Sequence, residues 1–302
     1  MRIFALELDN DIKGIEERKR YIEGLISRLP SPDLVVLPEL ALPSYMASPE
    51  IWKYADENAE DTSEWALATA DKYNTAIGTG YLERRDGDYY NRYMIVTPDG
   101  ISGSVTKGEG ESAVFKRGDF PSTIETPFGT VAVAICYDSR RRRFYENVKD
   151  KELSLILFPH GSPGDPGKTG DEKRSNDRRC SLYSEAFPVP VVYVNSTGSL
   201  PRMPGTMGGM MKRRGFRLNG LSHIYAPSGR RIESGVKEAV GLDVDLSPRR
   251  REKDIRFYGE DIEKGNFLFR HFILKRDTER GIRYYRENNP GNSSHQEATA
   301  GR

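Results

Sequence analysis

Residues 129–138 read GTVAVAICYD, an apolar run with a thiol near its end. A continuous apolar run of this length predicts a strand buried on both faces of a sheet. Three further runs share the pattern, at residues 33–40 (DLVVLPEL), 153–160 (LSLILFPH) and 188–196 (PVPVVYVNS). The alternating N-terminal residues 2–8 predict a strand that begins the fold.

Segments with helical spacing of apolar residues separate these strands, at residues 12–29, 49–73 and 171–187. Other segments predict hairpins, at residues 75–100 with a turn at Asp86-Gly87, and at residues 221–246. Buried strands mixed with hairpins favour an α/β fold in which helices cover mixed sheets, rather than a strictly parallel wound sheet.

Composition excludes several classes of protein. The 302 residues include 46 Lys and Arg against 45 Asp and Glu, a net charge of +1, so no broad field favours nucleic acid. No stretch approaches the ~18 apolar residues of a membrane helix, and the acidic N-terminus is unlike a signal peptide. Two cysteines are too few for a disulfide framework and fit a cytoplasmic protein.

Composition changes only near the C-terminus. From Arg286 the chain reads RENNPGNSSHQEATAGR, with almost no residue able to join a core. We expect one domain over residues 1–285 and a polar tail over 286–302, either disordered or lying as an arm on a partner subunit.

Two kinds of binding site can be set aside. Residues 153–170 imitate a phosphate-binding loop that ends in Gly167-Lys168-Thr169, but Ser162 occupies the position of the first glycine. The four histidines lack metal-ligand spacing and no CxxC pair is present, so no metal and no cofactor are expected. The arginine run 140–143 favours a solvated or interface face over an anion site.

Three reactive side chains stand at the ends of predicted strands: Glu39, Lys107 and Cys136. A lone cysteine at the end of an apolar strand is more often a packing residue than a nucleophile. Together with a carboxylate and an amine, however, it forms a complete acyl-transfer site. The carboxylate takes the thiol proton, the ammonium favours the thiolate and stabilises the oxyanion, and the sulfur attacks.

The order Pro38-Glu39-Leu40, Lys107 and Ile135-Cys136-Tyr137-Asp138 resembles the nitrilase superfamily of carbon–nitrogen hydrolases. The similarity extends over roughly residues 2–246 and includes PELALPSY, the hairpin with its Tyr90-Asn91 pair, LILFPHGS and PVVYVNSTG. The resemblance implies a four-layer α-β-β-α sandwich in a single domain. It also implies a homodimer or higher homo-oligomer.

The resemblance also implies roles for individual residues. Glu39 would be the general base, Lys107 the amine that stabilises the oxyanion, and Cys136 the nucleophile. A second glutamate of the family, which helps to orient the substrate, would be Glu111 rather than Glu109, because Glu109 lies only two residues after Lys107.

The substrate would be bound by Tyr45, Tyr137, His160 and Gly161, with the backbone N–H of Tyr137 completing the oxyanion hole.

Two segments depart from the family pattern. Extra arginines stand between Asp138 and Phe144, where the family segment usually touches both the pocket and the dimer interface. Residues 202–217, RMPGTMGGMMKRRGFR, have no clear counterpart and predict either a mobile loop near the pocket mouth or an interface loop. We interpret the second cysteine, Cys180, as a packing residue.

The resemblance implies hydrolysis of a small amide to a carboxylic acid and ammonia through a cysteine thioester. The Cys-Tyr-Asp sequence favours amides over nitriles, but N-carbamoyl amidohydrolase and nitrilase activities remain open. A catalytically idle scaffold or binding protein is the alternative of another class, although the glutamate, lysine and cysteine are all present. The sequence does not identify the acyl group or the leaving group.

Overall fold

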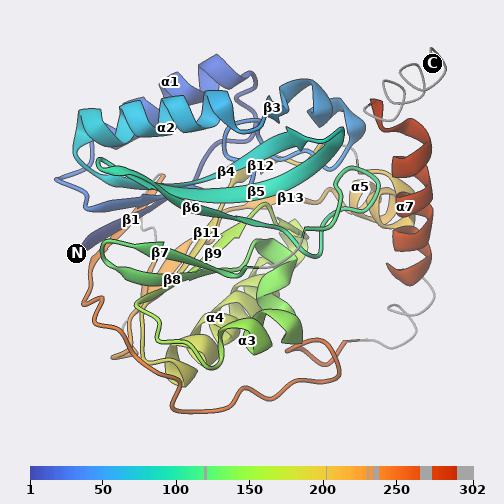
Figure 1. The fold of residues 1–302 in the computed structure, drawn as a ribbon. Helices are drawn as coiled ribbons and strands as arrows, with labels where there is room; N and C mark the ends of the chain where they lie inside the picture. The colour runs from blue at the N-terminus through green and yellow to red at the C-terminus, as the bar shows by residue number, and fades with distance from the viewer. Residues whose placement is uncertain (119–120, 202, 230, 234–237, 266–273, 291–302) are drawn as a thin grey trace.

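The structure, a computed structural model, describes residues 1–118, 121–201, 203–229, 231–233, 238–265 and 274–290. Two large sheets stack face to face (Figure 1). Among the described residues, the first sheet has the order β16-β1-β2-β4-β5-β6, with β3 paired to β4. Its strands are β1 (Arg2–Leu6), β2 (Leu34–Val36), β3 (Asp56–Glu57), β4 (Ala76–Arg85), β5 (Asp88–Thr97), β6 (Gly100–Thr106) and β16 (Ala239–Asp243).

The second sheet has the order β15-β14-β11-β9-β8-β7. Its strands are β7 (Thr123–Thr126), β8 (Gly129–Val133), β9 (Leu155–His160), β11 (Val191–Asn195), β14 (His223–Tyr225) and β15 (Arg231–Glu233). A small third sheet joins β10 (Pro163–Gly164), β13 (Arg217–Asn219) and β12 (Thr197–Ser199) in that order.

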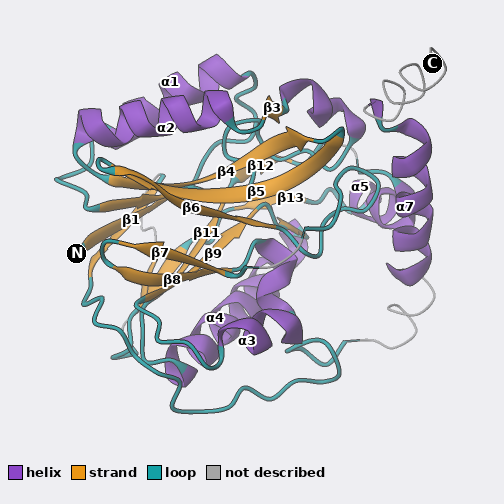
Figure 2. Cartoon of the chain, in the orientation of Figure 1, coloured by secondary structure: helices purple, strands orange, loops and turns teal. Residues whose placement is uncertain are grey.

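Helices cover the outer face of each large sheet (Figure 2). Helices α1 (Ile15–Ile26) and α2 (Glu60–Tyr73) lie on the first sheet, and α3 (Arg142–Val148) and α4 (Thr169–Ala186) on the second. The arrangement is therefore the four-layer α-β-β-α sandwich that the resemblance implied. Helices α5 (Gly205–Arg213) and α7 (Lys275–Asn288) lie together at one end of the sandwich.

Strand periodicity explains how the layers pack. In β8, Val131 and Val133 enter the core between the two sheets, whereas Ala132 faces the helical layer. In β9, Leu155 and Leu157 likewise face the other sheet. Because successive side chains alternate between faces, an all-apolar strand contributes to two cores at once. These continuous runs were correctly predicted to be buried strands.

The predicted helical stretch at residues 49–73 is wrong in its first half. A 3₁₀ turn spans Pro49–Tyr54, strand β3 follows, and α2 begins only at Glu60. Asn58 and Ala59 between them have φ angles of 52° and 62°. Two consecutive left-handed residues interrupt any right-handed helix, so the apolar spacing extends across a break that it does not reveal.

Two expectations about loops also need correction. The segment predicted as a loop over residues 202–217 contains helix α5, although Arg202 itself lies outside the described residues. The polar tail does not begin at Arg286, because α7 continues to Asn288 and Asn289 is buried. The remainder of the expected tail, residues 291–302, lies outside the described residues.

Among the helices of the described residues, none combines the length and the apolar character needed to span a membrane.

Candidate active site

Ends of strands from both sheets meet at one edge of the sandwich and carry the predicted site. Glu39 follows β2, and Lys107 comes directly after β6. From the second sheet, Cys136 follows β8 and Gly161 comes directly after β9. A side chain just beyond the end of a strand is held by the rigid sheet but is not confined to one of its faces. Such positions suit catalytic groups.

The turn that carries Glu39 packs tightly on β4. A Cβ atom on Gly80 would lie 2.4 Å from the backbone N of Leu40 and 2.6 Å from the carbonyl O of Pro38. Only glycine allows this approach of two backbones. The same reasoning applies to Gly161, where a Cβ would lie 2.1 Å from Cδ2 of Tyr45.

The ammonium of Lys107 lies between two carboxylates. Its Nζ is 2.5 Å from Oε1 of Glu39 and 3.1 Å from Oε2 of Glu111. The side chains of Lys107 and Glu39 are 1% and 0% exposed, so water screens this contact little. Tyr45 donates its hydroxyl hydrogen to Oε1 of Glu111 at 2.8 Å.

Glu39 has two more partners. The Nδ2 of Asn91 donates to Oε1 of Glu39 at 2.7 Å, and the backbone N–H of Gly161 donates to Oε2 at 2.7 Å. These bonds hold both carboxylate oxygens of Glu39 in fixed directions. Sequence reasoning missed the role of Asn91, although the Tyr90-Asn91 pair was part of the recognised pattern.

The two carboxylates titrate in opposite directions. Burial raises the pKa of Glu39, and the charge of Lys107 only partly opposes it. Burial also acts to raise the pKa of Glu111, but Lys107 and the Tyr45 hydroxyl outweigh it and lower that pKa below its usual value. For Lys107, burial acts to lower the pKa, while Glu111 and Glu39 together raise it well above the usual range.

Cys136 lies beside these charges. Its side chain is buried, and the charges of Glu39, Lys107 and Glu111 all act on the thiol, which also faces the backbone N–H of Gly161. Burial is the largest effect, and with the two carboxylates it raises the pKa of Cys136 to about 12 despite the opposing charge of Lys107. Lys107 thus acts in the expected direction, towards the thiolate, but burial and the two carboxylates outweigh it and favour the neutral thiol.

The backbone at Cys136 is strained. The residue begins a 3₁₀ turn, Cys136–Arg140, with φ of 52°, in the left-handed region that few non-glycine residues adopt. The Oγ of Ser139 donates to the carbonyl O of Cys136 at 2.6 Å and helps to hold this turn. The thiol thus projects from a sharp turn and not from the strand itself.

Asp138 connects this turn to the segment after Lys107. Its carboxylate accepts the backbone N–H of Gly108 at 2.9 Å and that of Glu109 at 2.8 Å. Burial raises the pKa of Asp138 to about 7, against the lowering effect of these bonds and of Lys107. Sequence reasoning read Asp138 only as part of a motif and assigned it no role.

Glu109, the glutamate not chosen, lies elsewhere. Its carboxylate pairs with Arg117 at 3.2 Å and with Arg141 at 3.3 Å. The structure therefore brings Glu111, and not Glu109, to Lys107.

Two predicted substrate-binding side chains, those of His160 and Tyr137, have partners other than Glu39, Lys107 and Glu111. The His160 ring packs on Tyr193, with centroids 4.5 Å apart, and its Nε2 is 3.4 Å from Oγ of Ser139. Burial lowers the pKa of His160 well below its usual value, so the ring is neutral. The Tyr137 hydroxyl donates to Oδ2 of Asp261 at 3.3 Å, which leaves only its backbone N–H to serve the site.

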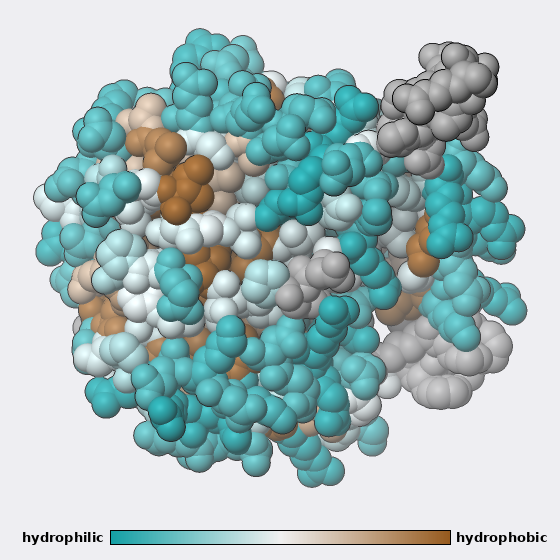
Figure 3. Space-filling view, viewed as in Figure 1, coloured by the Kyte–Doolittle hydropathy of each residue, from teal (hydrophilic) through white to brown (hydrophobic). Residues whose placement is uncertain are grey.

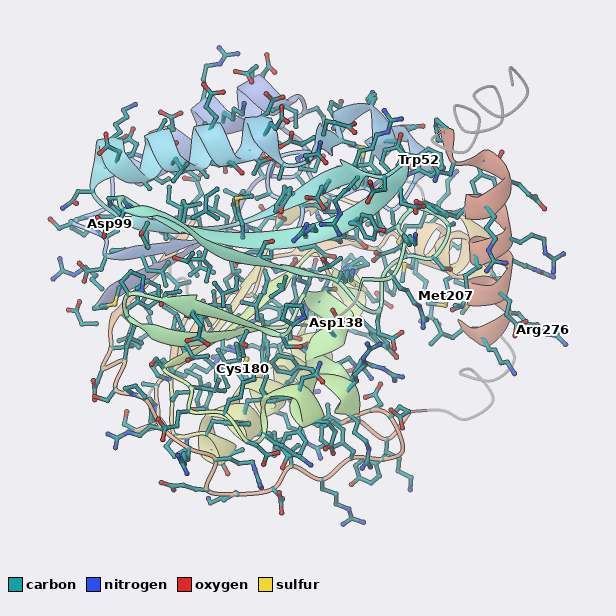
Figure 4. The ribbon with its side chains drawn as sticks, in the orientation of Figure 1. Trp52, Asp99, Asp138, Cys180, Met207 and Arg276 are labelled. Atoms are coloured by element: carbon teal, nitrogen blue, oxygen red, sulfur yellow. The ribbon has the colours of Figure 1, made fainter. Side chains whose placement is uncertain are left out.

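The arginine run 140–143, expected to be a solvated or interface face, is solvated only in part: Arg143 is exposed, whereas Arg140 and Arg141 are half-buried. Arg140 pairs with Asp261 at 3.2 Å and with Glu263 at 3.1 Å, and Arg141 pairs with Glu109. These ion pairs fasten the segment at residues 258–263 against the nucleophile turn. Cys180 is fully buried in α4, as the packing interpretation required (Figure 4).

No group of three or more His, Cys, Asp or Glu side chains suited to a metal ion occurs in the described part of the chain.

The family model of carbon–nitrogen hydrolases matches residues 13–242. An (R)-stereoselective amidase from a Pseudomonas species is 28% identical over 239 residues, covering 78% of this chain and 82% of that protein. An omega-amidase from Xenopus laevis is 28% identical over 140 residues, covering 40% of this chain and 50% of that protein.

Solved structures share the fold. A carbon–nitrogen hydrolase from Helicobacter pylori G27 has a TM-score of 0.68 at 19% identity, covering 82% of this chain and 89% of that chain. An amidase from Nesterenkonia sp. has a TM-score of 0.63 at 17% identity, covering 82% and 91%. A variant of that amidase shows covalent addition of the acetamide moiety of fluoroacetamide at its active-site cysteine. With its sandwich fold and a family match over most of its length, the chain belongs to the carbon–nitrogen hydrolase family of enzymes.

Proposed function

We propose that the protein hydrolyses a small amide to a carboxylic acid and ammonia through a thioester on Cys136. The observation that carries the proposal is the buried ammonium of Lys107 held between Glu39 and Glu111, with their charges acting on the Cys136 thiol. The amidase activities named for the Pseudomonas relative and the Nesterenkonia neighbour agree with it, and the covalent adduct on that neighbour's cysteine agrees with Cys136 as the nucleophile.

The first half-reaction begins with a neutral thiol. Because the pKa of Cys136 is raised to about 12, the proton must leave as the sulfur attacks, and ionised Glu39 accepts it. The new C–S bond places negative charge on the amide oxygen. Lys107 and the backbone N–H of Tyr137 stabilise that oxyanion. Glu39 then protonates the departing nitrogen, the C–N bond breaks, and ammonia leaves.

The second half-reaction uses the same glutamate. Glu39, ionised again, takes a proton from water as the water oxygen attacks the thioester carbon. The C–S bond breaks, the proton returns to the sulfur, and the acid is released. A raised pKa suits this cycle because it brings the carboxyl closer to neutral pH.

Glu111 has a different part in this scheme. Its lowered pKa keeps it ionised throughout, so it holds Lys107 and orients the substrate without exchanging protons. Two carboxylates whose pKa values move apart divide the acid–base and electrostatic tasks between them.

The test is ammonia release by the wild-type protein from a panel of ω-amides, N-carbamoyl amino acids and nitriles. We expect release from amides, and less than about a tenth of that release with Cys136→Ser. Release from nitriles alone, or from carbamoyl compounds alone, would replace the amidase assignment by one of those activities. No release from any compound would favour the idle scaffold. Assembly as a homo-oligomer and a cytoplasmic location stay predictions.

A further inference from the structure

Helix α7 lies outside residues 13–242, the part of the chain that the family model matches. Its exposed side is hydrophilic (Figure 3), and its other side packs on the end of the sandwich near Glu111. Figure 4 labels Arg276 on the outer side of α7 and Met207 of α5 on the side of the sandwich that faces it.

The closest contact is between Gly281 and the residues that follow Glu111. A Cβ on Gly281 would lie 2.2 Å from Oγ of Ser112 and 2.9 Å from the backbone N of Ala113. The Oγ of Ser112 also donates to the carbonyl O of Thr278 at 3.0 Å. The backbone of α7 therefore lies directly on the 112–113 peptide, with no room for a methyl group.

Tyr285 provides a second attachment. Its hydroxyl donates to Oδ1 of Asp88 at 3.0 Å and accepts the backbone N–H of Tyr89 at 2.9 Å. The Tyr285 ring also meets the edge of Trp52, with centroids 6.1 Å apart. The Nε1 of Trp52 in turn donates to the carbonyl O of Val114 at 2.8 Å. Through Trp52, Tyr285 is thereby connected to Val114, two residues after Ser112.

A third attachment links α7 to α5. Oδ2 of Asp277 accepts the backbone N–H of Met207 at 2.9 Å, which satisfies a free donor in the first turn of α5.

Glu111 begins the turn that α7 covers. Its carbonyl O accepts the backbone N–H groups of Val114 at 2.8 Å and Phe115 at 3.0 Å. Its side chain extends the other way, to Lys107 and Tyr45. A shift of the turn would carry the carboxylate with it, and hydrogen bonds to a charged group lose strength quickly with distance and angle.

We propose that α7 is a positioning element of the active site: it holds the turn at residues 111–115 so that Glu111 reaches Lys107 and Tyr45. The inference rests on the proposed function for its effect on turnover, but the contact itself can be measured without any substrate. Glu111 acts on the reaction, and α7 acts through Glu111.

The decisive variant is Gly281→Ala, with Gly24→Ala as its matched control. Gly24 is a helical glycine of α1, and apart from its chain neighbours and the adjacent backbone of its own helix no described atom lies within 4 Å of its Cβ position. We expect Gly281→Ala to lower kcat for an amide at least tenfold and Gly24→Ala to leave it unchanged. In addition, Gly281→Ala should move the acid limb of the pH–rate profile to higher pH, because a displaced Glu111 loses the lowering effect of Lys107 on its pKa.

Hydrogen exchange reads the contact independently of catalysis. In Gly281→Ala the amides of Val114 and Phe115 should exchange at least tenfold faster, whereas Gly24→Ala should match the wild type. Adding Ser112→Ala to Gly281→Ala removes the 2.2 Å contact but leaves the backbone N of Ala113 at 2.9 Å, so it should restore only part of the protection and of kcat.

Normal exchange and normal kcat in Gly281→Ala would overturn the proposal. Faster exchange with unchanged kcat and pH profile would overturn it as well, since α7 would then be a structural element only. If the wild-type protein releases ammonia from no amide, the proposed function fails, while the exchange data still decide whether α7 holds the turn.

Discussion

The carboxylate of Asp138 accepts the backbone N–H of Gly108, at 2.9 Å, and so ties the nucleophile turn of one sheet to the lysine segment of the other. Its second oxygen accepts the N–H of Glu109 at 2.8 Å. Cys136 and Lys107 belong to different sheets, and this two-oxygen bridge is a direct bond between the segments that carry them. A carboxylate can accept at both oxygens, whereas an asparagine amide would present hydrogens to one of the two donors.

Asp138→Asn should therefore loosen the alignment of Cys136 with Lys107. The amide nitrogen of asparagine would face one of the two N–H groups, and a buried donor left unpaired costs about 1–3 kcal/mol. We expect kcat/KM to fall by about 10- to 100-fold, mainly in kcat, as measured by steady-state ammonia release. Unchanged kcat would contradict the alignment role. Asp150→Asn, on an exposed residue outside the site, is the control and should be neutral.

The same residue predicts how stability depends on pH. Burial raises the pKa of Asp138 from its usual 3.8 to about 7, so between these values the folded chain keeps a proton that the unfolded chain releases. This contribution to stability is fully present below about pH 3.8 and is lost as the pH rises through about 7. It amounts to roughly 4 kcal/mol at most. Denaturant unfolding at pH 5 and pH 8 should show the wild type losing more stability than Asp138→Asn over that interval; equal losses would contradict the raised pKa.

Cys136→Ser should leave the fold intact and reduce turnover to less than about a tenth of the wild-type rate. This corresponds to an activation free energy that is higher by more than ~1.4 kcal/mol. A serine hydroxyl is harder to deprotonate than a thiol, and Glu39 is its only neighbouring base in the proposed scheme. Cys180→Ser makes the same chemical change at a fully buried packing site. It should lower stability by about 1–3 kcal/mol, because the hydroxyl enters an apolar core, and keep activity per folded molecule. Loss of activity in both variants alike would count against Cys136 as the nucleophile.

Glu39→Gln and Glu111→Gln should fail at different steps. Without a proton acceptor at position 39 the neutral thiol cannot attack, so no acyl group should accumulate on Cys136. Glu111→Gln keeps that acceptor and should acylate, then hydrolyse slowly because the substrate and Lys107 are poorly held. Intact mass spectrometry after mixing with an amide distinguishes the two. An adduct in Glu39→Gln with none in Glu111→Gln would reverse the assigned roles.

Tyr45→Phe tests the hydroxyl that donates to Glu111. Hydrogen bonds to charged groups contribute about 1.5–3 kcal/mol, so we expect kcat/KM to fall by roughly 10- to 100-fold. Tyr183→Phe is the control, since that buried hydroxyl has no hydrogen-bond partner in the described structure. It should leave both activity and stability near wild type. Equal effects of the two substitutions would mean that the Tyr45 bond does not matter for catalysis.

Periodicity in the sequence was informative wherever a strand is buried on both faces. The run at residues 129–138 predicted β8 because its side chains enter two cores, one between the sheets and one under α3 and α4. The layered arrangement came from the resemblance, since many folds place helices on mixed sheets. The break at Asn58 and Ala59 could not be predicted, because left-handed backbone at such residues depends on the packing around them.

The candidate site also contains residues that the local sequence could identify and residues that it could not. Glu39, Lys107 and Cys136 could be named from their places at strand ends, and spacing alone selected Glu111. His160 has the same parity in β9 as Phe158, which faces the helices, so strand alternation indicates which side its ring takes; its contact with substrate stays a prediction. The roles of Asn91 and Asp138 depend on hydrogen bonds between segments far apart in the chain, and no local pattern encodes those.

Strand β1 lies between β2 and β16, and Arg2 meets Asp243 across 241 positions of the chain. During synthesis the N-terminal strand therefore emerges long before one of its two neighbours exists. Contacts of such high sequence separation slow folding, and an unpaired strand edge invites association with other chains. Until β16 has been made, one edge of β1 stays unpaired, so we expect the chain to be prone to association while its second sheet is being synthesised. Co-expression with a chaperone that covers strand edges should therefore raise the yield of soluble protein. It should do so more than lowering the final concentration of the finished protein does.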